Sequence, residues 1–117
     1  MLLAAVDGEQ HVLTLDALAA LLTEHGEAVV SLGASTPGDA LDTAIRRLRP
    51  AAVFLWAPVE RPSVAEVALA LRAWPPISAR RPLRIVVGGR GWHGIDLPPA
   101  VQLVAGLAEA RAALVDF

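Results

Sequence analysis

The chain opens with Leu2-Leu3-Ala4-Ala5-Val6 and continues directly into Asp7-Gly8-Glu9-Gln10-His11. An uninterrupted apolar run of this length predicts a strand that is buried on both faces, as in a parallel sheet. The polar residues that follow then form a loop at the carboxyl edge of the sheet, where open α/β folds bind ligands. Glu9 lies two residues before His11 and is placed to orient the imidazole ring, as carboxylates orient metal-binding histidines.

The rest of the chain alternates between apolar runs and amphipathic stretches. Further strands are predicted at 28–32, 51–56, 83–87 and 101–104, and helices at 13–25, 38–48, 63–74 and 107–115. The run at 51–56 is continuously apolar and is predicted to be central. Ser63 and Glu66 have the spacing of a capping box. Proline-rich stretches at 58–62, 75–82 and 98–99 are predicted connectors.

Strands that alternate with helices in this way predict an α/β fold: a doubly wound, five-stranded parallel sheet. For one domain of 117 residues the flavodoxin-like (Rossmann-like) order 2-1-3-4-5 is the natural choice. Its switch point lies between the first and third strands. The loops that carry His11 and Trp56 should therefore flank the binding crevice.

Composition excludes several function classes. The formal net charge is −2, and no basic surface of the nucleic-acid-binding kind is indicated. Cysteine is absent, which excludes disulfides and thiolate-bound metals. No apolar run approaches the ~20 residues of a membrane span, and no segment resembles a signal peptide. We expect a cytoplasmic domain that contacts neither membrane nor nucleic acid directly.

Several familiar motifs are incomplete. Residues 89–94 have the G-x-G-x-x-G spacing, but they follow the fourth strand instead of the first, so a dinucleotide site is not predicted. A phospho-receiver needs an acidic residue at the end of the third strand and a lysine, whereas the chain has Trp56 there and no lysine. The pair Gly88-Gly89 indicates either a tight turn or the close approach of a backbone or ligand.

Catalytic and multi-histidine metal sites are also weakly indicated. The serines lie at ordinary cap and turn positions, and no Ser-His-acid arrangement is assembled. A metal site built from His11, His25 and His93 is weak, because His25 lies at the far end of its helix.

The segment Val6-Asp7-Gly8-Glu9-Gln10-His11-Val12-Leu13 resembles the loop after the first strand of cobalamin-binding domains. Gly-Glu-Gln-His is most similar to the variant of MerR-type cobalamin-dependent transcription regulators, including light-sensing ones. The resemblance continues through 32–37, 48–50, 86–91 and 107–111. It implies that cobalamin (adenosyl- or hydroxocobalamin) is bound base-off, with His11 as the lower cobalt ligand and Glu9 bonded to the other ring nitrogen. The remaining residues that it places in the cofactor site are Thr14, Gly33, Trp56, Gly88 and Gly89.

Two residues depart from this family pattern. Thr14 stands where the family has glycine, and Trp56 stands where it usually has serine, beside the path of the cofactor's nucleotide tail. Overfilling a packed site typically costs ~1–3 kcal/mol. Trp56 is therefore expected to plug the tail channel, to turn aside and stack on the cofactor, or simply to fill the core.

Three functions follow as hypotheses. The leading one is a cobalamin-binding sensory module, not an enzyme, in a transcription regulator whose DNA-binding and helical-bundle domains lie outside this chain. The second is a degenerate domain with a plugged site that acts in dimerisation or protein interaction. The third is a subunit or carrier domain of a cobalamin-dependent mutase or methyltransferase, in which the cofactor does the chemistry. The second makes a homo-oligomer an expected state.

Overall fold

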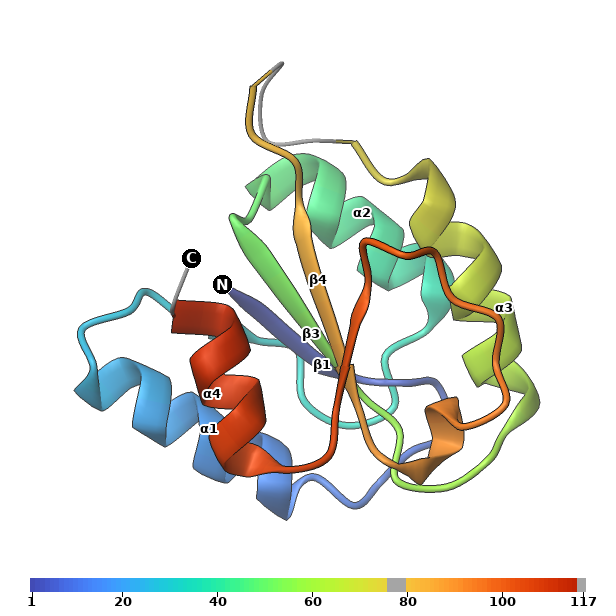
Figure 1. Ribbon diagram of the computed structural model, residues 1–117, viewed down its shortest axis with the longest axis horizontal. Coiled ribbons are helices and arrows are strands. Elements are labelled where there is room, and N and C mark those ends of the chain that lie inside the picture. Colours follow the sequence, from blue (N-terminus) through green and yellow to red (C-terminus); the bar gives the residue numbers. More distant parts are fainter. Residues whose placement is uncertain (76–79, 116–117) are drawn as a thin grey trace.

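The computed structural model describes residues 1–75 and 80–115 and contains a parallel sheet between two layers of helices (Figure 1). The strands of these described ranges are β1 (Leu2–Ala5), β2 (Val30–Ser31), β3 (Ala52–Trp56), β4 (Arg84–Gly88) and β5 (Gln102–Val104). Their order is β2-β1-β3-β4-β5, with parallel pairing throughout. The predicted fold class, strand order and central position of the third strand are confirmed.

The helices divide between the two faces of the sheet. α1 (Leu13–Glu24) and α4 (Leu107–Val115) cover one face, and α2 (Gly38–Leu48) and α3 (Pro62–Ala70) cover the other (Figure 1). Short 3-10 helices follow α3 and β4, at Leu71–Ala73 (η1) and Arg90–Trp92 (η2). Each face has its own apolar core, because strands buried on both sides present side chains to both layers. Within the described ranges no helix is long and apolar enough to cross a membrane.

Two predicted elements are wrong in extent. The helix predicted at 63–74 begins at Pro62, whose missing N–H costs nothing in a first turn, and its α-helical part ends at Ala70. The strand predicted at 28–32 pairs with β1 only at Val30–Ser31, on the edge of the sheet. Of the predicted connector 75–82, residues 76–79 lie outside the described residues.

The capping box predicted from Ser63 and Glu66 is also wrong. Arg61 holds the position before α3, and no side chain caps that helix. Ser63 lies inside the first turn, and its hydroxyl donates to the carbonyl oxygen of Asp7 at 2.7 Å. Its polar group therefore serves the loop after β1 instead of its own helix.

One row of paired residues defines the carboxyl edge of the sheet. Ala5, Trp56, Gly88 and Val104 lie side by side at the ends of β1, β3, β4 and β5. Trp56 packs with the core on the α1 and α4 face, to which Ala5 and Val104 also belong. The indole thus has small neighbours on both adjacent strands, which leaves space for a large side chain at this position.

Candidate functional site

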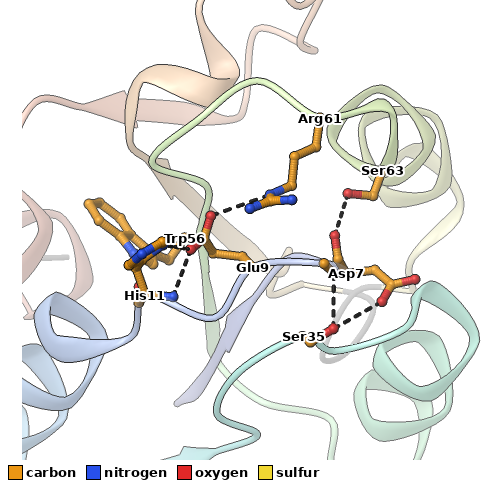
Figure 2. A network of polar contacts seen from close by, with 8 residues as sticks. Asp7, Glu9, His11, Ser35, Trp56, Arg61 and Ser63 are labelled. Carbon is orange, nitrogen blue, oxygen red and sulfur yellow. Dashed lines mark hydrogen bonds and ion pairs between the residues drawn. The ribbon is translucent and has the colours of Figure 1, made fainter.

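The loop between β1 and α1 holds a buried carboxylate against an exposed imidazole (Figure 2). Glu9 is 0% exposed, whereas the His11 side chain is 85% exposed. Glu9 Oε2 accepts a hydrogen bond from the His11 backbone N–H at 2.7 Å and lies 2.9 Å from His11 Nδ1. A carboxylate only accepts, so in the neutral ring Nδ1 carries the proton and Nε2 keeps its lone pair. The predicted contact between these two side chains is present.

Arg61 supports Glu9 from the opposite side. Its Nε lies 3.4 Å from Glu9 Oε1, and its guanidinium covers Gly8, where a Cβ atom would come within 3.3 Å of Arg61 Nη1. Burial alone would raise the pKa of Glu9, but the two hydrogen bonds from His11 and the charge of Arg61 outweigh it. The pKa of Glu9 is therefore lowered, and the group that orients His11 is an anion.

Two serines from other parts of the chain bind the same segment, Ser35 from the loop after β2 and Ser63 from the first turn of α3 (Figure 2). Ser35, after β2, accepts from the Gly8 N–H at 2.9 Å and donates to Asp7 Oδ1 at 3.2 Å. The Ser35 N–H donates to the Glu9 carbonyl at 2.7 Å, and Ser63 binds the Asp7 carbonyl from α3. The loop after β2 and the first turn of α3 thus hold the His11 loop from both sides.

Arg61 is absent from the predicted site, and both serines are predicted at ordinary turn or cap positions. The contacts of Ser35 and Ser63 join residues that are 27, 28 and 56 positions apart. No spacing within one segment signals such contacts, because they arise only when parallel strands bring their loops to one edge.

Trp56 reaches across the sheet edge to the same loop. Its Nε1–H donates to the His11 carbonyl oxygen at 2.9 Å, and its ring lies beside His11 (Figure 2). The indole, Thr14 in the first turn of α1, and Leu107 in α4 surround an interior space of about 10 Å³. A cavity needs about 10–15 Å³ to hold one water. The space between the indole, α1 and α4 is therefore filled by protein.

The predicted glycines have different surroundings. A Cβ atom on Gly89, which has a φ of 102°, would overlap the Ala57 carbonyl oxygen, and one on Gly88 would lie 2.9 Å from Phe54 Cζ. The close approach predicted after the fourth strand is thus made by the protein itself. Gly33 lies apart from these two, in the loop after β2, where its carbonyl accepts from the Ala5 N–H at 3.1 Å.

The three histidines do not form a common site. Within residues 1–75 and 80–115 no three His, Asp or Glu side chains gather to hold a metal ion. His25 follows α1 and contacts Arg111. His93 lies on the walls of two open hollows, one of about 540 Å³ shared with Arg61 and one of about 340 Å³ shared with Trp56. His11 is the histidine with a buried carboxylate partner.

No protein-family model matches this chain, and no curated protein matches its sequence. Solved structures match it over nearly its whole length. A novel cobalamin-binding protein from Desulfitobacterium hafniense has a TM-score of 0.75 at 20% identity, over 97% of this chain and 56% of that one. The monomethylamine corrinoid protein of Methanosarcina barkeri has a TM-score of 0.70 at 14% identity, over 98% and 56%. The chain thus spans about half the length of these proteins.

Receiver domains share the same topology at a greater structural distance. The signal receiver domain of the response regulator NarL from Mycobacterium tuberculosis has a TM-score of 0.56 at 20% identity, over 98% of this chain and 93% of that one. The chain lacks the lysine and the acidic residue at the end of β3 that a phospho-receiver needs. Its fold is the flavodoxin-like fold of cobalamin-binding domains.

Proposed function

We propose that this chain is a corrinoid-binding module in which His11 is the lower ligand of cobalt. The observation that carries the proposal is the pairing of a fully buried, ionised Glu9 with an exposed His11 at the carboxyl edge of β1. The carboxylate holds Nδ1 and leaves Nε2 free to bind a metal. One protein ligand suffices, because the corrin ring supplies the equatorial nitrogens itself.

The residues present fit such a group at the surface of the site. His11 Nε2 is a suitable donor. Two open hollows at the same edge are bordered by Arg61 and Trp56, which bond to Glu9 and to the His11 carbonyl. The names of the similar structures, a cobalamin-binding protein and a corrinoid protein, agree with this choice of ligand. The space between Trp56, Thr14 and Leu107 does not fit the base of a nucleotide tail, because only about 10 Å³ is left there.

The wider role rests on the sequence resemblance. Gly8-Glu9-Gln10-His11 resembles the loop of MerR-type cobalamin-dependent regulators, and we therefore propose a regulatory, non-enzymatic module in the cytoplasm. DNA-binding and helical-bundle domains would be supplied from outside this chain. Adenosyl- or hydroxocobalamin is the cofactor that this resemblance implies, bound with its own base displaced from cobalt.

An absorbance titration tests the cobalt ligand. Hydroxocobalamin, adenosylcobalamin and cobinamide, a corrinoid without the nucleotide tail, are each added to the wild type, to His11→Ala and to His25→Ala. His25→Ala is the matched control, because His25 is an exposed histidine that follows α1 and contacts Arg111, away from the His11 loop. We expect the wild type and His25→Ala to shift the corrinoid spectrum and His11→Ala not to. A wild type that shifts no corrinoid spectrum contradicts the proposal, as does an unchanged shift in His11→Ala.

A second candidate is a degenerate domain that uses this edge to bind another protein or a second copy. The filled interior around Trp56 favours it, together with Leu13, which is 84% exposed two residues after His11. Light scattering would then detect a dimer that Leu13→Ser weakens. Leu69→Ser, a change at an exposed leucine on α3, is the control that should leave the dimer intact.

A further inference from the structure

We propose that Trp56 makes this site select corrinoids without a nucleotide tail over complete cobalamins. The inference rests on the proposed function and names the ligand class of the same site. It follows from two neighbouring features: an exposed His11 imidazole, and a filled space beside the Trp56 indole, which bonds to the His11 carbonyl.

The filled space is the product of the sheet register. Trp56 lies between Ala5 and Gly88 in the row at the carboxyl edge, and both neighbours are small enough to admit the indole. Thr14 and Leu107 close the remaining sides, and about 10 Å³ is left. A cavity of roughly 150 Å³ holds benzene, and the bicyclic base of a cobalamin tail is larger than benzene. A displaced tail therefore has no interior cavity to enter between the sheet and the helices α1 and α4, and the hollow of about 340 Å³ that Trp56 also borders is open to solvent.

The indole is also tied to the ligand loop. Trp56 Nε1–H donates to the carbonyl oxygen of His11 itself. Swinging the indole out would break this bond and release the backbone of the residue that is to hold cobalt. One net hydrogen bond of up to ~1.5 kcal/mol corresponds to about tenfold in affinity. Opening the channel for a tail thus weakens the ligand site at the same time.

A corrinoid without a tail meets neither difficulty. In a complete cobalamin the tail's own base occupies the lower cobalt position and has to leave before an imidazole can bind. In cobinamide that position holds only exchangeable small ligands. The His11 imidazole is 85% exposed, so it can displace such a ligand while Trp56 stays in place.

The ratio of the dissociation constants for hydroxocobalamin and cobinamide tests the proposal. Both are measured by absorbance titration on the wild type, on Trp56→Ser with Thr14→Gly, on Trp56→Phe, and on the surface control Leu69→Ser. We expect the wild type and Leu69→Ser to bind cobinamide at least about tenfold more tightly, and the double variant to lose most of that preference. Trp56→Phe keeps most of the bulk without the hydrogen bond and should keep part of it. Circular dichroism establishes that each variant is folded.

The outcomes separate the two proposals. A wild type that binds hydroxocobalamin as tightly as cobinamide, with its base displaced, overturns the selectivity and leaves the corrinoid function standing. A wild type that binds neither corrinoid overturns the function and the selectivity together. A folded double variant with the wild-type ratio shows that the indole is not the selective element. If the double variant does not fold, Trp56→Phe takes its place: a smaller preference than in the wild type supports the role of the indole, and an unchanged preference overturns it.

Discussion

Replacing Glu9 with glutamine removes one charge from the centre of the site and almost no volume. The carboxylate accepts from three donors: the His11 N–H and Nδ1–H at Oε2, and the Arg61 Nε–H at Oε1. A glutamine amide has one oxygen and one NH₂ group. Whichever way the amide is turned, its NH₂ group faces a donor, so one side of the network is lost.

The expected cost follows from these contacts. The less costly rotamer directs the amide oxygen to His11, because the two bonds there are short and Arg61 is 32% exposed and can be hydrated. Two hydrogen bonds to a charged group, at about 1.5–3 kcal/mol each, become neutral ones at about 0.5–1.5 kcal/mol. The contact between Arg61 and the carboxylate is also partly lost. We therefore expect Glu9→Gln to lower the free energy of unfolding by roughly 2–3 kcal/mol.

Urea unfolding at neutral pH, followed by far-ultraviolet circular dichroism, measures this difference. Glu60→Gln is the matched control: it removes the same charge one residue from Arg61, but at an exposed position, and should change stability by less than about 0.5 kcal/mol. A loss below about 0.5 kcal/mol in Glu9→Gln as well would refute the view that the buried carboxylate organises this loop.

Three other changes test the surrounding structure. Folding lowers the pKa of Glu9 from its ordinary 4.5, so the stability that this group contributes is complete above that pH and is lost as the pH falls through the lowered pKa. The difference in urea midpoint between the wild type and Glu9→Gln should therefore shrink over that acidic range. A difference that stays constant with pH would contradict this expectation. In Gly89→Ala the new methyl group would overlap the Ala57 carbonyl, and the backbone has a positive φ. We expect this change to lower the free energy of unfolding in urea by about 3 kcal/mol or more. Gly106→Ala is the control and should be nearly neutral, because nothing lies within 4 Å of its new methyl group. Ser63→Ala should lower the free energy of unfolding by about 1 kcal/mol, because the Ser63 hydroxyl binds the Asp7 carbonyl. Glu66→Ala should lower it little. An equal loss in both variants would instead support a capping box formed by these two residues.

The elements that the sequence predicted well are those whose signal is local. The helices at 38–48 and 107–115 have the predicted bounds, and the strand at 51–56 is central in the sheet. A continuous apolar run predicts a strand that is buried on both faces, and strands in a parallel sheet are buried in this way. The contact between Glu9 and His11 was also predictable from a local signal, because a separation of two residues places both side chains in one short loop.

Contacts between distant segments were not predictable in this way. Ser63 has the local signal of a helix cap but binds Asp7 instead, and Arg61 carries no local signal of its contact with Glu9. The sequence left three alternatives for the Trp56 side chain: it could plug the channel for the nucleotide tail, stack on the cofactor, or fill the core. The placement of this side chain depends on Ala5 and Gly88 being its neighbours across the sheet, and on Thr14 and Leu107 bordering the same small space.

The amino-acid sequence by itself therefore determined the parallel sheet, its strand order and the histidine with its carboxylate at the carboxyl edge. Only the tertiary structure decided whether space remains beneath that histidine. Hydrophobic patterning depends on neighbours along the chain, whereas the free volume at position 56 depends on the register of β1, β3 and β4 and on the packing of α1 against α4.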